Sequence, residues 1–159
     1  MQTDSLIKKL EAYSLVAQQL LDLSENSKAL MLTSEAHYIL NNYKKLIADE
    51  KIETQVNHIY LKSLMATDSV NQAISLATKL YNEGDRTLFI IKYLIKSYKD
   101  KLAYKEALYI IEDNVTHNQY RIIDLITYSE FQQLYNKVGN SVSYDLYYSN
   151  LLNKAKDNL

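Results

Sequence analysis

Apolar residues recur at intervals of three and four positions along nearly the whole chain. This spacing places them on one side of an α-helix, so the pattern predicts helices rather than strands. Short polar or charged stretches interrupt it, and each is expected to connect two helices. The pattern predicts eight helices, over about residues 3–23, 27–48, 54–66, 70–82, 86–99, 103–114, 120–137 and 141–156.

Several predicted boundaries carry signals for a helix end. Ser69 precedes the fourth helix and Gln72 follows three residues later, which is the pattern of a capping box. Gly84 is suited to end that helix, because glycine readily adopts the left-handed conformation of a C-terminal cap. Asp85 can cap the fifth helix with its carboxylate. Gly139 is expected to end the seventh helix, and "ADEKIE" at 48–53 to form a charged connection.

A 34-residue period relates the predicted helical hairpins. Ala73, Ala107 and Ser141 are spaced 34 residues apart, and each is a small residue near the start of the second helix of a hairpin. A small side chain at this position lets paired helices approach to about 8–10 Å. Neighbouring hairpins are then expected to stack, since none of them buries its apolar face alone.

The residues at this spacing resemble the tetratricopeptide repeat (TPR), a family of 34-residue helix–turn–helix repeats. "YLIKSY" and "YKEALYII" within 87–117 match best, followed by "YLKSL" and "NQAISLA" within 54–84. Residues 121–151 match less well, because Asp145 stands where an apolar residue is expected. The family's tryptophan, the small residue of its first helix and its closing proline are absent.

The resemblance implies one all-α domain over residues 1–159, built as a TPR-like α-solenoid of stacked antiparallel hairpins. Residues 1–48 would form an N-terminal hairpin outside the 34-residue register, because Ala36 lies 37 residues before Ala73. Another helical array and an ordinary helical bundle are the alternatives.

Composition supports a helical protein. The chain has 159 residues, of which 47% are hydrophobic, with two glycines and no proline. A β-rich fold would need more of these turn-forming residues. The chain has no cysteine, which excludes disulfides and thiolate metal sites. The first residues lack the apolar core of a secretory signal and no window approaches 18 apolar residues, so we expect a cytoplasmic protein without a membrane span.

The sequence contains no motif that indicates catalysis, a metal or a cofactor. His37, His58 and His117 lack the spacing of metal ligands. Two isolated glycines cannot form a glycine-rich phosphate loop. Carboxylates such as Glu112 and Asp113 fall near predicted helix ends, where solvated charge is expected. We therefore predict a non-enzymatic protein without catalytic residues, bound metal or cofactor.

Positive charge is concentrated in one segment of the chain. The net charge is −1, but residues 86–105 carry six basic residues against one acidic residue. In TPR proteins the first helices of the hairpins line a concave groove that binds peptides. The resemblance places Gln55, His58, Lys62 and Met65 of the third helix, and Phe89, Lys92, Lys96 and Lys99 of the fifth, in this groove.

Lys92, Lys96 and Lys99 are spaced so that they share one helical face. Together with Lys62 and Phe89 they form the predicted partner-binding site, a basic strip suited to an acidic peptide or a C-terminal carboxylate. The alternative interpretation is that these lysines form only the solvated face of an amphipathic helix.

The leading functional hypothesis is a protein–protein interaction module that acts as a scaffold, adaptor or chaperone. It would bind an acidic peptide or a partner helix in the concave basic groove. The layout resembles that of the small TPR chaperones of bacterial secretion systems. One alternative is a peptide-sensing regulatory domain. Another is a nucleic-acid-binding protein that uses segment 86–105, although the net charge of −1 argues against nucleic acid.

Tyrosines are frequent in the last two predicted helices. Neighbouring residues of a helix point about 100° apart, so Tyr147 and Tyr148 cannot both face one core. We expect at least one of them at a surface, where a terminal hairpin could support homo-oligomerisation. Packing in the core is the alternative interpretation for this group.

Overall fold

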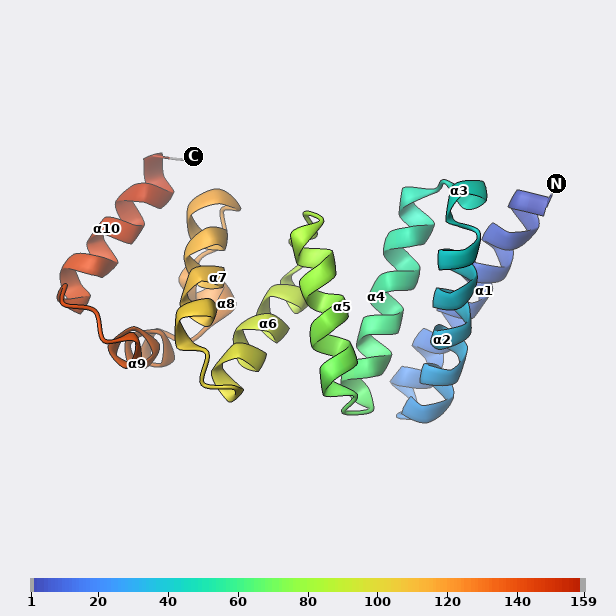
Figure 1. Cartoon of the computed structure of the whole chain (residues 1–159), viewed down its shortest axis with the longest axis horizontal. Coiled ribbons are helices and arrows are strands. Elements are labelled where there is room, and N and C mark those ends of the chain that lie inside the picture. Colours follow the sequence, from blue (N-terminus) through green and yellow to red (C-terminus); the bar gives the residue numbers. More distant parts are fainter. Residues whose placement is uncertain (1, 158–159) are drawn as a thin grey trace. The chain divides into compact units, whose positions relative to one another are not determined.

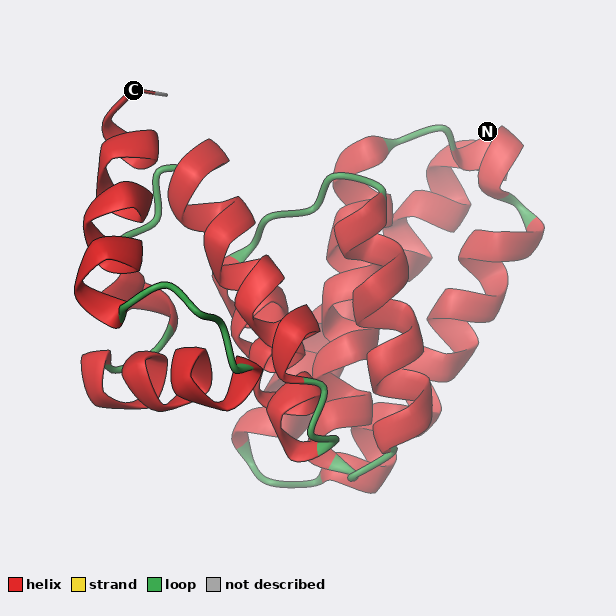
Figure 2. Cartoon of the chain, turned by 60° about the vertical axis from the view of Figure 1, so that its left-hand side comes forward, coloured by secondary structure: helices red, strands yellow, loops and turns green. Residues whose placement is uncertain are grey.

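The computed structural model describes residues 2–157, and these residues form helices and no strand (Figures 1 and 2). The all-α prediction is therefore confirmed. The helices are α1 (Gln2–Asp22), α2 (Asn26–Asn42), α3 (Lys44–Ile47), α4 (Glu50–Ala66), α5 (Val70–Asn82), α6 (Leu88–Asp100), α7 (Tyr104–His117), α8 (Ile122–Leu125), α9 (Tyr128–Val138) and α10 (Tyr144–Asp157). The described part of the chain thus has ten helices where the sequence pattern predicts eight.

One additional helix arises because the predicted helix 27–48 is interrupted at Tyr43. This residue leaves the helical conformation, with φ −120° and ψ 21°, and separates α2 from α3. Ala48 then adopts a left-handed conformation, and the Asp49 carboxylate accepts a hydrogen bond from the Ile52 N–H at 3.1 Å. The prediction of a non-helical connection over 48–53 is wrong, because this cap starts α4 at Glu50.

The other additional helix arises where the predicted helix 120–137 is interrupted at Ile126 and Thr127. Ile126 is extended, with φ −160° and ψ 154°, and separates α8 from α9. The Thr127 hydroxyl accepts a hydrogen bond from the Glu130 N–H at 3.2 Å and so caps α9. Ile122, Leu125 and Ile126 are all buried on both sides of this interruption.

Both glycines lie where the sequence predicts helix ends. Gly84 follows α5 with φ +102°, and Gly139 follows α9 with φ +75°. The prediction that Asp85 caps α6 is wrong: its carboxylate accepts a hydrogen bond from the Thr87 N–H at 3.0 Å, and Thr87 is the capping residue, without a side-chain cap hydrogen bond. Because Thr87 is the residue that flanks the helix, α6 begins at Leu88 instead of residue 86.

The chain divides into two compact units, Met1–Leu76 and Ala77–Leu159, with the division inside α5. In the first unit α1 packs against α2 and α4, and α2 packs against α4. Its core contains aliphatic and small side chains: Leu10, Ala36, Ile39, Leu40, Ile47, Ile52 and Val56. The fully buried Ala17, Ala29 and Ala36 allow close approach of these helices.

In the second unit α7 packs against α6, α9 and α10. Ala107 on α7 is fully buried, as its predicted packing role requires, and Ala73 on α5 is also fully buried. Ser141 is different, because it precedes α10 and is exposed. The prediction that it packs between helices is wrong, since the turn after Gly139 continues through Ser143.

Candidate functional site

The residues of the predicted binding site are distributed over both units. Lys62 is exposed on α4 in the first unit, whereas Phe89, Lys92, Lys96 and Lys99 lie on α6 in the second. The basic strip that would join Lys62 to the others therefore stays a prediction. The four residues on α6 can be considered together, because one helix positions them.

Helix α6 is amphipathic, and its lysines mark the solvent side. Ile90, Ile91 and Leu94 are almost completely buried, which fixes the rotation of the helix. Lys92 and Lys96 are exposed, while Phe89 and Lys99 are half-buried. We call Phe89, Lys92 and Lys96 the lysine face of α6, because they follow one another at helical spacing.

Two of the three α6 lysines are paired with carboxylates. The Lys99 Nζ lies 3.1 Å from the Glu130 Oε2 of α9, and this hydrogen bond holds the pKa of Glu130 below its usual value. Lys96 Nζ lies 3.5 Å from Asp100 Oδ2, one turn along the same helix, where both side chains are exposed. Lys92 forms no ion pair with any residue between 2 and 157. Lys99 thus connects α6 to α9, and the charge that solvent meets comes from Lys92 and Lys96.

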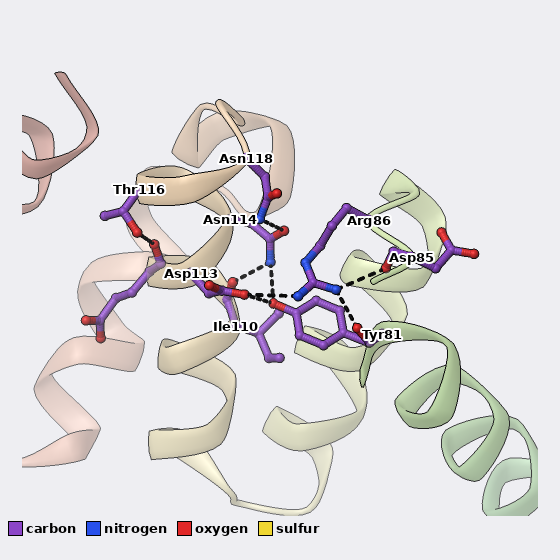
Figure 3. A network of polar contacts seen from close by, with 9 residues as sticks. Tyr81, Asp85, Arg86, Ile110, Asp113, Asn114, Thr116 and Asn118 are labelled. Atoms are coloured by element: carbon purple, nitrogen blue, oxygen red, sulfur yellow. Dashed lines mark hydrogen bonds and ion pairs between the residues drawn. The ribbon is translucent and has the colours of Figure 1, made fainter. Parts of the chain in front are cut away.

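Arg86 belongs to the same basic segment, but its side chain is directed into the protein (Figure 3). Its guanidinium carbon lies 3.6 Å from the centre of the Tyr81 ring. Its Nη2 lies 3.6 Å from Asp113 Oδ2, and its Nη1 donates a hydrogen bond to the Tyr81 carbonyl. Arg86 therefore offers less charge to solvent than its place in the basic segment suggests, because the Tyr81 ring and the Asp113 carboxylate engage its guanidinium.

Around Arg86, fully and partly buried polar side chains of α5 and α7 form a network (Figure 3). The Tyr81 hydroxyl donates a hydrogen bond to Asp113. The fully buried Asn114 donates to Tyr81 Oη at 3.0 Å and to the Ile110 carbonyl at 2.7 Å. Burial, followed by the hydrogen bond to Asp113, raises the pKa of Tyr81 above its usual value. These groups hold the tyrosine protonated and connect the end of α5 to α7.

Sequence reasoning missed this network, although one signal for it is visible. Asn114 follows Ala107, Ile110 and Ile111 at helical spacing, on the apolar side of α7. A polar residue at such a position needs a buried partner. The identity of the partner could not be predicted, because Tyr81 lies 33 residues earlier in the chain.

The tyrosines of the last two helices pack against one another. The rings of Tyr135 on α9 and Tyr147 on α10 are stacked with centres 4.2 Å apart. Phe131 is fully buried, and its ring centre lies 6.0 Å from that of Tyr147. The Tyr147 hydroxyl is buried beside Glu112 without a hydrogen bond of good geometry, and burial raises the pKa of both groups. Tyr148 is half-buried and lies on another side of α10, as expected for a neighbouring residue.

The described residues contain no cluster of three or more histidine or carboxylate side chains that could hold a metal ion. In the same part of the chain, every helix is too short or too polar to cross a membrane. Comparison of the sequence with family models and curated proteins, and of the structure with solved structures, finds no match. The TPR resemblance therefore stays a prediction.

Proposed function

We propose that this chain is a non-enzymatic protein-interaction module that binds an acidic peptide or partner helix on the lysine face of α6. The exposed Lys92 carries the proposal, because it has no ion-pair partner in residues 2–157 and shares a helical face with Lys96 and Phe89. Two adjacent positive charges favour a partner with carboxylates. The half-buried Phe89 ring adds apolar surface at the end of the same face.

The ion pairs of the α6 lysines favour binding at Lys92 and Lys96 over binding at Lys99. The Lys96–Asp100 pair is exposed, and such pairs contribute only about 0–1 kcal/mol. A partner carboxylate can therefore replace Asp100 at low cost. Lys99 is less available, because Glu130 already holds it against α9. We therefore assign Lys92 and Lys96 the main role in binding, and Lys99 a structural role.

The charge distribution favours an acidic peptide over nucleic acid. Segment 86–105 has fewer available charges than its sequence suggests, since Arg86 and Lys99 are engaged with carboxylates of the same chain. Binding to a phosphate backbone depends on many available cations. A scaffold, an adaptor, a chaperone or a peptide-sensing domain in the cytoplasm could all use the lysine face, and the identity of the partner would separate them.

Affinity purification from the native host, followed by mass spectrometry, tests this proposal. We expect Lys92→Glu/Lys96→Glu to lose the partners that the unaltered chain retains. The matched control is Lys8→Glu/Lys51→Glu, which makes the same change in net charge at two exposed lysines of the first unit. Equal retention by both variants would reject the lysine face as the binding site. Equal loss would show a response to net charge alone.

A further inference from the structure

A second candidate site is a cavity of about 320 Å³ in the second unit, at the end of α7, α8, the start of α9 and α10. Its walls include the side chains of Tyr120, Tyr128, Tyr148 and Leu152. Two cations, Arg121 and Lys156, also line it, and no carboxylate is among its described lining residues. The cavity therefore combines aromatic walls with positive charge.

The apolar walls of this cavity are only partly covered by the protein. Tyr128 is 51% exposed and Leu152 is 43% exposed, while Tyr148 is half-buried. A ligand that fills the cavity would remove this apolar surface from water, which is favourable. The volume lies at the lower end of the range for small-molecule sites. Its tyrosine rings offer edges and faces to an aromatic group.

The two cations differ in how much charge they can offer. The Asp124 carboxylate accepts hydrogen bonds from Arg121 Nε at 3.2 Å and from Arg121 Nη2 at 2.9 Å, so the positive charge of Arg121 is largely balanced. Lys156 is exposed in the last turn of α10 and pairs with no carboxylate in the described chain. Its neighbour Asp157 lines a different cavity, together with Lys154. The unbalanced charge at the aromatic cavity therefore comes from Lys156.

From this arrangement we infer that the cavity binds a small carboxylate that carries an aromatic or branched apolar group. The apolar group lies among Tyr120, Tyr128 and Tyr148, and the carboxylate faces Lys156. The inference goes beyond the proposed function and is independent of it, because none of these residues belongs to the lysine face of α6. Either the proposed function or the inference about the cavity can therefore be rejected while the other stands.

The probe is 3-phenylpropionate, titrated into the ¹³C-labelled chain and followed by methyl NMR. We expect saturable shifts of the Ala155 and Leu152 methyl signals with a dissociation constant on the order of 1 mM, which is typical for a ligand of this size. The neutral 3-phenylpropionamide should bind about threefold to fivefold more weakly, because it loses one exposed charge pair. This comparison requires no variant and so does not depend on folding of a mutant.

Matched variants test the role of the cation. Lys156→Gln should weaken binding of the acid by about threefold to fivefold and leave binding of the amide unchanged. Lys154→Gln is the control, since it removes the same charge two residues away on α10, at the other cavity. Equal binding of acid and amide would overturn the inference, as would the absence of saturable shifts to about 10 mM. So would shifts confined to Leu94 and Ile110, which line a separate cavity.

Discussion

The two units of the chain bury polar groups in different ways. In the first unit the Thr33 and Ser63 hydroxyls donate to carbonyls of their own helices, Ala29 O and Ile59 O, each at 2.9 Å. In the second unit the buried Ser97 does the same, but Tyr81 of α5 also bonds across helices, donating to Asp113 and accepting from the fully buried Asn114 of α7. Polar contacts within one helix do not select a neighbour, whereas contacts between helices require one arrangement. The second unit therefore depends more on specific partners than the first.

The largest expected effect comes from replacing buried polar residues with apolar ones of similar size. Asn114→Leu removes the hydrogen bond to the Tyr81 hydroxyl and the acceptor of the Asn118 amide, so we expect a loss of about 2–3 kcal/mol in the free energy of unfolding. Thr33→Val removes only a bond within one helix and should cost less than about 1 kcal/mol. Urea unfolding followed by circular dichroism measures both. Equal losses would contradict the difference between the units.

A smaller effect is expected from removing single tyrosine hydroxyls. Tyr81→Phe leaves Asp113 and Asn114 with one partner fewer, and we expect a loss of about 1–2 kcal/mol. Tyr13→Phe is the matched change in the first unit, where the hydroxyl donates to Glu35 at 3.1 Å on the surface. It should cost less than about 0.5 kcal/mol. The same unfolding experiment compares them, and a larger cost for Tyr13→Phe would count against the network.

The smallest expected effect is a change in melting temperature that depends on pH. Burial raises the pKa of Glu112 in the folded chain, so the proton is bound more tightly in the folded state than in the unfolded state. Glu112 therefore favours folding at acid pH, and this contribution is lost as pH rises above the usual carboxyl range. We expect Glu112→Gln to melt at a higher temperature than the unaltered chain near pH 7. The difference should disappear near pH 4.

The contribution of Glu130 to stability is expected to change with pH in the direction opposite to that of Glu112, so the two variants can be compared. The hydrogen bond from Lys99 holds its pKa below the usual value, so its stabilising contribution is present at neutral pH and lost as pH falls. Glu130→Gln should therefore lower the melting temperature slightly at pH 7 and have no effect in acid. If the two variants changed with pH in the same direction, the assigned causes of the two pKa shifts would be wrong.

Much of the fold could be predicted from the sequence, because it depends on local signals. Apolar spacing located α1 and the helices from α5 to α7 closely, and Gly84 and Gly139 lie at predicted helix ends. The interruptions at Tyr43 and Ile126 were missed, since the apolar spacing continues through them and tertiary burial decides where each helix stops. The site was predictable only in part. Helical spacing grouped Lys92 with Lys96, but it could not show that Glu130 holds Lys99 or that Tyr81 and Asp113 hold Arg86.

The most direct test of the account measures the affinity of the lysine face for a defined acidic ligand. A fluorescein-labelled peptide of alternating glutamate and leucine is titrated with the chain, and binding is followed by fluorescence anisotropy at low salt. We expect Lys92→Glu/Lys96→Glu to raise the dissociation constant more than about tenfold, because it converts two favourable charge contacts into repulsion. Lys8→Glu/Lys51→Glu should change it less than about twofold. An equal change in both variants, or no change in either, would contradict the account.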